Sequence, residues 1–252
     1  MVITKDWETG GGAVTITYDG DGDGTISVSS DINPGAARQM VLAVSNDYGQ
    51  SVDLTVKQEG IYDAEVEYLE TDSSDVCYIQ TDYVPSGANI SYETKFRWIS
   101  WGGSSNTYIA SYAARTSSST QGFMAWRNSS NARQIKIYCG QRGWANSGIT
   151  KSLTSGKDVV LHADVNSIDF NGTVSTYSEG AYSSANKQAL RLWHNSIPIS
   201  LRYYYFKMWD DGVLKLDLIP VRVGNVGYMY DRVTGNLYGN SGSGNFIIGP
   251  DL

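Results

Sequence analysis

The sequence predicts an all-β protein built from two sandwiches, a small one in residues 1–60 and a larger antiparallel jelly roll in residues 61–252. The first observation is composition. The 252 residues include 27 Gly, 18 Tyr and 7 Trp, and only 18% are charged, which favours aromatic strands joined by polar turns. The second is periodicity, because apolar residues recur at every second position and no segment keeps a helical period over successive turns.

Four segments of the first domain alternate in this way. They are AVTITY (13–18), TISVSS (25–30), RQMVLAVS (38–45) and SVDLTVKQ (51–58). The joints between them are rich in Gly, Asp and Asn, which accept the dihedral angles of tight turns. We expect a four- or five-stranded sandwich, followed by EGIYD (59–63) as a linker.

From residue 64 the alternation restarts with longer, more aromatic segments. They are AEVEYLET (64–71), DVCYIQTD (75–82), NISYETKFRWIS (89–100), NTYIASYAAR (106–115), GFMAWRN (122–128), RQIKIYCG (133–140), KDVVLHADV (157–165), SIDFNGTVSTYS (167–178), QALRLWHN (188–195), LRYYYFKMWDDGVLKLDLIPVRV (201–223) and VGYMYDRVTGNLYGN (226–240). Asn171-Gly172 and Asp211-Gly212 are typical centres of two-residue hairpins. So many strands predict a jelly roll of two antiparallel sheets.

The run DGDGDG raises the question of a metal site. Asp19, Asp21, Asp23 and Gly24 fit the first half of an EF-hand calcium loop. An EF-hand also requires flanking helices and a glutamate at its twelfth position, whereas strand-like segments flank this run and Ser30 stands at that position. We therefore expect a turn between two strands. Weak Ca²⁺ binding by the three aspartates is the one cofactor left open.

Charge and hydropathy exclude two classes of partner. The formal net charge is −7, the isoelectric point is near 4.8 and the sequence has no basic run, which argues against nucleic-acid binding. No apolar stretch approaches the ~18 residues that span a bilayer, so no membrane insertion is expected. No export signal follows Met1, so we expect no standard secretion if Met1 is the native start.

Two cysteines, Cys77 and Cys139, lie in strand-like segments without metal-ligand spacing. Two buried free thiols are the favoured interpretation, and a disulfide stays open because sequence alone cannot place the two Cα atoms within bridging distance.

The last 50 residues contain a strand that ends in WDDG, then IPVR, VGYMYD and GNSGSGNF. This order resembles the C-terminal pattern of concanavalin A-like, laminin-G-type jelly rolls found in structural proteins of gut bacterial phages and prophages. VEYLETDSSDVCYIQTDYVP is similar to the opening strands of the same family. The resemblance implies the fold of residues 61–252 but no particular ligand, because this fold hosts lectins, hydrolases and structural modules alike.

The N-terminal part is similar to a BACON-type, immunoglobulin-like bacterial module. The similarity lies in the Gly-rich turn GDGDG, the strand TISVSS and the closing VKQEG, while the usual first strands are shortened to VITKDW. Such modules mostly act as spacers or mediate adhesion.

Catalytic patterns are weak. Glu65, Glu67 and Glu70 approach the spacing of the carboxylate pair of retaining glucanases, but we expect solvated edge carboxylates. His162 and His194 lie in alternating segments, and we expect packed or surface histidines. The glycines of GNSGSGNF have neither the helix nor the lysine of a phosphate loop, so a strand connection is expected.

Aromatic residues are the better binding candidates. Their rings can stack on sugars, although we expect roughly three in four of them to fill the core. The candidates for a glycan-binding face include Trp98, Tyr112, Trp193 and Tyr203–Tyr205, and those that we favour are Trp101, Trp144, Tyr108 and Trp126. Trp101 and Trp144 lie in Gly- and Ser-rich segments typical of exposed loops.

The resulting hypothesis is a non-enzymatic surface protein of a phage virion, a head decoration or fibre component, whose jelly roll contacts host or mucosal glycans. Its partners would be capsid or other virion proteins and surface glycans, and a homo-oligomer is plausible. The alternatives are a carbohydrate-binding protein on the surface of a gut bacterium and, with less support, a glycoside hydrolase.

Overall fold

The structure is a computed structural model of the whole chain. It describes the backbone of residues 2–7, 14–19, 25–30, 33–45, 48–72, 74–85, 89–101, 108–113, 124–127, 134–138, 149–176, 187–192 and 199–252. Side chains are described for residues 27–29, 33–45, 48–72, 74–85, 89–100, 135, 137, 149–176, 189–192 and 200–252.

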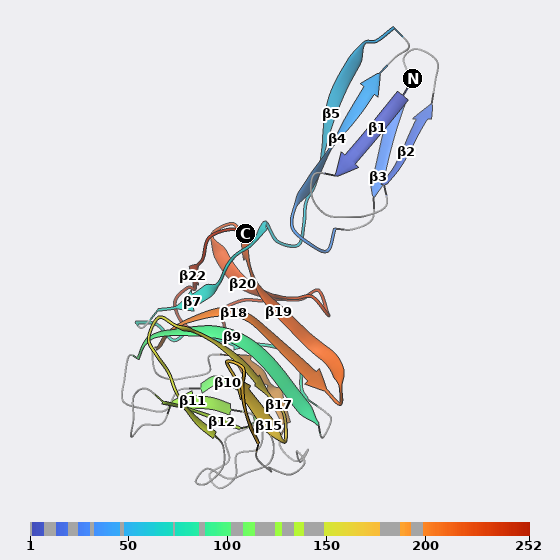
Figure 1. Cartoon of the computed structure of the whole chain (residues 1–252). Coiled ribbons are helices and arrows are strands. Elements are labelled where there is room, and N and C mark those ends of the chain that lie inside the picture. Colours follow the sequence, from blue (N-terminus) through green and yellow to red (C-terminus); the bar gives the residue numbers. More distant parts are fainter. Residues whose placement is uncertain are drawn as a thin grey trace. The chain divides into compact units, whose positions relative to one another are not determined.

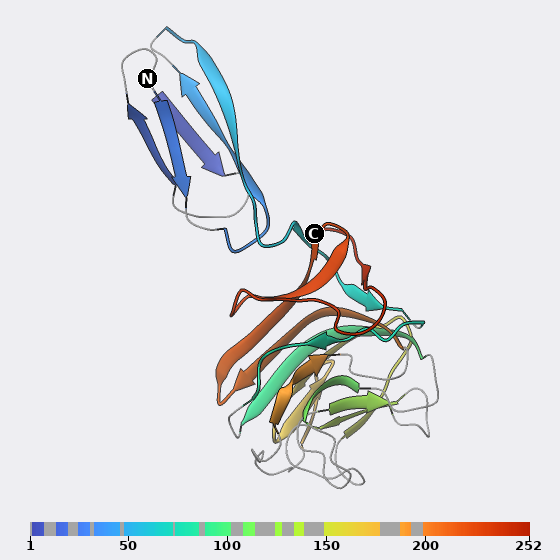
Figure 2. The ribbon, with the colours of Figure 1, turned by 180° about the vertical axis from the view of Figure 1, so that it is seen from behind.

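The chain divides into two compact units, Met1–Glu65 and Val66–Leu252. Figure 1 and Figure 2 show strands throughout each unit. The predicted all-β class is confirmed, because the regular elements of the described residues are strands. In this part of the chain no helix is long and apolar enough to cross a membrane. The predicted domains, an immunoglobulin-like sandwich in residues 1–60 and a jelly roll in residues 61–252, stay a prediction.

The first unit is made of short antiparallel strands. They are β1 (Val2–Trp7), β2 (Val14–Asp19), β3 (Thr25–Ser30), β4 (Arg38–Ser45) and β5 (Ser51–Gln58). The two residues of β6 (Ala64–Glu65) end the unit and pair with none of these strands. β1, β4 and β5 form one sheet, and β2 pairs with β3. The four alternating segments therefore became β2 to β5, and VITKDW became β1. On β4, the alternation buries Met40 and Leu42.

The segment predicted as a linker is built into the first unit, so that prediction is wrong. The Ile61 amide donates to the Gly35 carbonyl at 3.0 Å, and the Ala37 amide donates to the Tyr62 carbonyl at 3.2 Å. A Cβ on Gly60 would lie 2.2 Å from the Gly35 oxygen. This crossing of two backbones needs a residue without a side chain. Turn-forming composition alone could not distinguish such a crossing from a free linker.

The second unit has a large antiparallel sheet. Its strands are β7 (Leu69–Thr71), β9 (Ile90–Trp101), β14 (Asp158–Ala163), β15 (Ser167–Phe170), β16 (Thr173–Thr176), β18 (Ile199–Asp210), β19 (Val213–Val223), β20 (Val226–Asp231), β21 (Leu237–Tyr238) and β22 (Ile247–Ile248). Their order is β16-β15-β14-β9-β18-β19-β20-β21. β7 lies beside the first part of β18 and also pairs with β22.

A smaller antiparallel sheet forms the other layer (Figure 1). In order, its strands are β13 (Ile149–Ser152), β12 (Gln134–Tyr138), β11 (Met124–Arg127), β10 (Tyr108–Ala113), β17 (Lys187–Leu192) and β8 (Ile79–Gln80). Two layers of antiparallel strands confirm the predicted sandwich. β13 was not predicted, and only two residues of DVCYIQTD are strand.

One core fills the second unit. Alternate residues of β9 and β18 contribute its largest side chains, among them Tyr92, Phe96, Tyr203 and Phe206. The smaller sheet contributes Ile79, Ile135, Ile137, Leu190 and Leu192. Burial of alternate residues leaves the other half of each strand on the outer face of its sheet.

The predicted hairpins are present. Asn171 and Gly172 have φ of 52° and 79°, and Asp211 and Gly212 have φ of 49° and 79°. Positive φ at both central residues is the requirement of a type I′ turn, which Asn-Gly and Asp-Gly satisfy at low cost.

The glycine-rich tail connects β21 to β22, as predicted. A Cβ on Gly242 would lie 1.8 Å from the Val76 carbonyl oxygen, so the two backbones are in contact. The Asn240 side-chain oxygen accepts the Gly242 amide at 2.9 Å. Cys77 is a buried free thiol whose Sγ donates to the Ser243 carbonyl at 3.3 Å. Burial raises the pKa of this thiol to about 11.

Candidate functional site

A β-bulge changes which tyrosines of β18 reach the outer face of the large sheet. Tyr203 pairs with Phe96 of β9, and Tyr205 pairs with Lys95, so Tyr204 is an extra residue. Tyr203 is fully buried, whereas Tyr204 and Tyr205 are both partly exposed. A bulge re-aims side chains in this way. Two consecutive tyrosines therefore lie on the outer face.

Charged residues occupy neighbouring strands beside the bulge. Arg97 of β9 is the cross-strand partner of Asp158 on β14 and of Arg202 on β18. Arg202 is in turn the partner of Glu70 on β7. Cross-strand partners point to the same face of a sheet. The outer face thus carries a row of two arginines flanked by two carboxylates.

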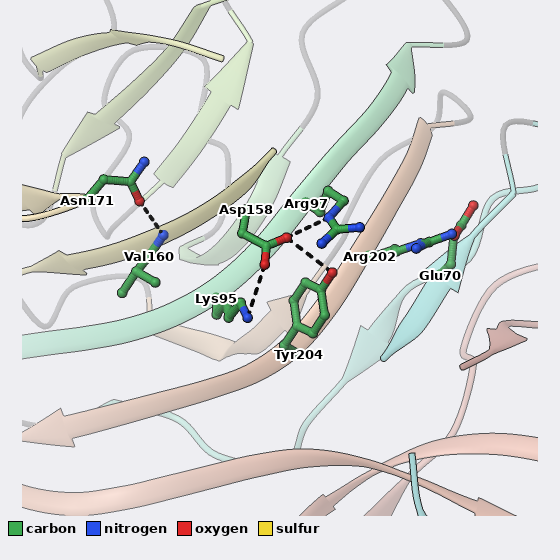
Figure 3. Close-up of polar contacts among 8 residues, drawn as sticks. All are labelled: Glu70, Lys95, Arg97, Asp158, Val160, Asn171, Arg202 and Tyr204. Carbon is green, nitrogen blue, oxygen red and sulfur yellow. Dashed lines mark hydrogen bonds and ion pairs between the residues drawn. The ribbon is translucent and has the colours of Figure 1, made fainter. Parts of the chain in front are cut away.

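Tyr204 lies at the centre of this group (Figure 3). Its hydroxyl donates to Asp158 Oδ1 at 3.2 Å, and the Lys95 Nζ lies 4.4 Å from its ring centre. The Arg97 guanidinium lies 5.7 Å from the ring centre. The Tyr68 ring meets Tyr204 edge-on, with centroids 6.0 Å apart and an interplanar angle of 72°. Burial, and then the Asp158 charge, raise the pKa of Tyr204 to about 12, so its hydroxyl stays a donor at neutral pH.

Asp158 joins three strands (Figure 3). It accepts the Arg97 Nε at 2.5 Å and pairs with the Lys95 Nζ at 3.1 Å. The hydrogen bond from Arg97, aided by Lys95, holds the pKa of Asp158 below its usual value and outweighs the opposing effect of burial. Asp158 is therefore ionised at neutral pH.

Glu70 pairs with the second arginine of the row, Arg202. Its Oε2 accepts the Arg202 Nε at 2.5 Å, and its Oε1 accepts the Ser200 hydroxyl at 3.2 Å. The Arg202 guanidinium lies 4.1 Å from the Tyr68 ring centre, a cation–π contact. The hydrogen bond to Glu70 raises the pKa of Arg202.

We call this group the Tyr204 cluster. It consists of Tyr68, Glu70, Lys95, Arg97, Asp158, Arg202 and Tyr204. The side chains of Lys95, Arg97, Asp158 and Arg202 are between 28% and 33% exposed, so the cluster is ordered by its contacts yet reaches solvent. Next to it, the Tyr205 hydroxyl donates to Glu93 Oε1 at 2.9 Å. The arrangement offers aromatic rings, cationic donors and carboxylate acceptors on one surface.

The four favoured aromatic residues are placed only by their backbone or not at all. Trp101 ends β9 opposite Ile199. Tyr108 and Trp126 are cross-strand partners on β10 and β11 of the smaller sheet, so the structure brings these two together. The side chains of these three residues and the whole of Trp144 lie outside the described part of the chain.

The predicted calcium ligands are not tested. Asp19 ends β2 and is the cross-strand partner of Thr25 at the start of β3, so strands flank the run as expected. Asp21, Asp23 and Cys139 lie outside the described residues. Among the residues that are described, no group of three His, Cys, Asp or Glu side chains could hold a metal ion.

Two of the candidate catalytic residues, Glu65 and Glu70, have structural partners. Glu65 accepts a hydrogen bond from the Tyr62 hydroxyl at 3.0 Å, and Glu67 is exposed. Glu70 differs from the prediction of a solvated edge carboxylate, because β7 pairs on both sides and the Glu70 side chain is only 13% exposed. His162 is partly exposed on β14, with its ring 6.3 Å from Trp209. His194 lies outside the described residues.

Comparisons with known proteins identify no family. Neither protein-family models nor curated proteins give a match. Among solved structures, the chain is similar to a Bacteroides ovatus protein that is provisionally assigned as carbohydrate binding. The sequence identity is 11%, the TM-score is 0.48, and the match covers 86% of this chain and 68% of the other. The resemblance to BACON-type modules and phage proteins therefore stays a prediction.

Proposed function

We propose that the second unit binds carbohydrate on the outer face of its large sheet and does not cleave it. The observation that carries the proposal is the bulge at Tyr204, which places Tyr204 and Tyr205 side by side among charged hydrogen-bonding groups. The apolar face of a sugar ring packs on an aromatic ring, while its hydroxyls bond to the polar side chains around it.

The two rings are held in place before any ligand arrives. Asp158 fixes the Tyr204 hydroxyl, and Glu93 fixes the Tyr205 hydroxyl. Because these side chains have little rotamer freedom left to lose, binding to them is less costly in entropy. This preorganisation favours a binding surface over a set of loose surface residues.

The carboxylates of the cluster suit binding rather than cleavage. A glycosidase needs a carboxyl group that retains a proton to give to the leaving oxygen, and its pKa is therefore raised. The pKa of Asp158 is shifted in the opposite direction by Arg97. Glu70 is occupied by Arg202 and Ser200. Both carboxylates thus act as hydrogen-bond acceptors within the cluster rather than as proton donors.

The place of display is part of the same proposal. A phage virion, with the protein as head decoration or fibre component, is the setting that the sequence resemblance favours. The surface of a gut bacterium is the alternative, and in either setting the protein would be a non-enzymatic adhesion protein. Virion proteins and a second copy of the chain are the proposed protein partners.

The test is glycan binding by a double variant. The full-length chain would be applied to an array of neutral and acidic oligosaccharides, and the best ligands would be titrated by calorimetry. We expect Tyr204→Ala with Tyr205→Ala to weaken binding about tenfold or more, which corresponds to roughly 1.4 kcal/mol of lost stacking. Tyr48→Ala is the matched control, since Tyr48 is a tyrosine of the first unit with 92% of its surface exposed.

Three outcomes would contradict the proposal. They are the absence of binding to any glycan, equal binding by the double variant and the wild type, and release of new reducing ends from a bound glycan by the wild type. The third would revive the hydrolase alternative, with Glu65→Gln and Glu67→Gln as the next variants to assay.

A further inference from the structure

Two arginines face each other across strands at the centre of the proposed binding face. Arg97 on β9 and Arg202 on β18 are direct cross-strand partners. Like charges in this position destabilise a sheet unless other groups compensate for them. The flanking carboxylates, Asp158 and Glu70, lie on the far sides of the pair, on β14 and β7 (Figure 3).

Each arginine is bound by its carboxylate through one nitrogen. Arg97 donates through Nε to Asp158, and Arg202 donates through Nε to Glu70. Among the described residues, the terminal nitrogens of these two guanidinium groups make no hydrogen bond. In contrast, Arg222 donates to Asp251 through two nitrogens, Nε and Nη2.

The free terminal nitrogens are the preferred donors for an oxyanion. A guanidinium binds carboxylate and sulfate oxygens through paired N–H groups, more strongly than it binds neutral oxygens. The rings beside them carry the aromatic faces already described. The ring centre of Tyr204 lies 5.7 Å from the Arg97 guanidinium, and the ring centre of Tyr68 lies 4.1 Å from the Arg202 guanidinium.

We infer that Arg97 and Arg202 bind the acid group of an acidic sugar, a carboxylate or a sulfate ester, whose ring packs on Tyr204 and Tyr205. The inference rests on the proposed function and narrows it to acidic glycans. A single anion between the two guanidinium groups would also reduce the repulsion that Asp158 and Glu70 leave between the facing arginines.

The charges of the cluster and of the whole chain favour glycans whose acid groups are spaced apart over dense polyanions. Lys95, Arg97 and Arg202 exceed Asp158 and Glu70 by one positive charge, and the exposed Glu67 close to Arg97 offsets this excess. The chain as a whole carries −7. Salt screens this charge beyond ~10 Å, but a dense polyanion would lie close to the negative surface and be repelled by it. A ligand with one acid group at the cluster avoids that repulsion.

The first experiment needs no variant. The wild-type chain would be applied to an array that pairs neutral oligosaccharides with their carboxylated and sulfated counterparts. We expect the acidic member of a pair to bind about tenfold to a hundredfold more tightly, as charge-assisted hydrogen bonds imply. Chemical reduction of the sugar carboxylate to an alcohol should remove the preference for carboxylated ligands. The carboxylated and sulfated members distinguish the two sources of the anion.

The second experiment uses conservative variants. Arg97→Lys and Arg202→Lys keep the charge but lose the forked donor geometry. We expect each variant to weaken binding of the acidic member at least several-fold more than it weakens binding of the neutral member. Arg222→Lys is the matched control and should leave both affinities unchanged. Thermal unfolding of each variant confirms that it is folded.

The outcomes separate the inference from the proposed function. Equal or tighter binding of the neutral members overturns the inference and leaves carbohydrate binding intact. Acidic preference that survives in both arginine variants also overturns the inference. Binding restricted to dense polyanions and abolished by moderate salt would show general charge attraction instead. No binding to any glycan overturns the proposed function itself.

Discussion

Asp158 is the residue on which the Tyr204 cluster depends most, because Lys95, Arg97 and Tyr204 all contact its carboxylate. Arg97 and Lys95 lower its pKa from the ordinary value of 3.8. A carboxylate with a lowered pKa stabilises the folded state above its unfolded pKa, and this contribution is lost as the pH falls through the folded pKa. Acid therefore removes the stabilisation.

An Asp158→Asn variant tests this linkage. At pH 7 we expect it to be less stable than the wild type by on the order of 1 kcal/mol, a modest value because the group is about one-third exposed and solvent screens the charges. The difference should shrink between pH 5 and pH 3 as the wild-type carboxyl becomes protonated. Thermal unfolding of both proteins across this range measures it.

Asp251→Asn is the control for this prediction. Asp251 also pairs with an arginine, but its side chain is 49% exposed, and removal of such an exposed pair should change stability little. A gap between Asp158→Asn and the wild type that stays constant from pH 7 to pH 3 would show that protonation of Asp158 is not the cause.

At the scale of elements, the glycine-rich tail lies in close contact with the backbone at Val76, and this contact requires glycine at position 242. Replacement by alanine would force the Val76 carbonyl and the tail apart, because the new Cβ would lie 1.8 Å from that oxygen. We expect a loss of about 1–3 kcal/mol, or roughly 2–10 °C in Tm for a unit of this size.

Gly212→Ala is the comparison for this variant. Gly212 has φ of 79° and nothing within 4 Å of a Cβ, so its replacement introduces only backbone strain, of about 1 kcal/mol. If Gly242→Ala melts no lower than Gly212→Ala, the close approach of the two backbones is not a determinant of stability.

Strands and hairpins could be predicted from sequence because their signals are local. Alternation identified β4, β5, β9 and β18, and Asn171-Gly172 identified a turn with positive φ. The bulge could not be located in the same way. A regular strand would place Tyr203 and Tyr205 on one face and Tyr204 on the other, so the run of tyrosines does not reveal the bulge. Only the pairing of Tyr203 with Phe96 and of Tyr205 with Lys95 shows that Tyr204 is extra.

The Tyr204 cluster itself depends on register across four strands. Glu70, Arg97, Asp158 and Arg202 lie far apart in the sequence and meet only through the order β14-β9-β18-β7. Single-sequence patterns contain no information on that order. Sequence reasoning therefore favoured aromatic residues in loop-like segments and treated Glu70 as a solvated residue.

For the whole molecule, the remaining prediction concerns where it is displayed. If the protein belongs to a virion, purified phage particles should contain it, and mass spectrometry of particles banded by density should find peptides from both units. Antibody labelling of intact particles should place it on their surface. Particles that lack the chain would contradict the virion setting and favour the bacterial surface.

The pairing of β7 between β18 and β22 has a consequence for synthesis of the chain. Glu70 meets Ile247, and the Glu67 amide bonds to the Pro250 carbonyl at 2.8 Å. β7, the first strand of this unit to be translated, therefore cannot pair with β22 until the end of the unit has been translated. The sheet cannot close until those residues have left the ribosome, and such long-range pairing makes folding slow. Until then, the nascent unit leaves the edge of β7 unpaired, and unpaired strand edges make a folding intermediate prone to aggregation.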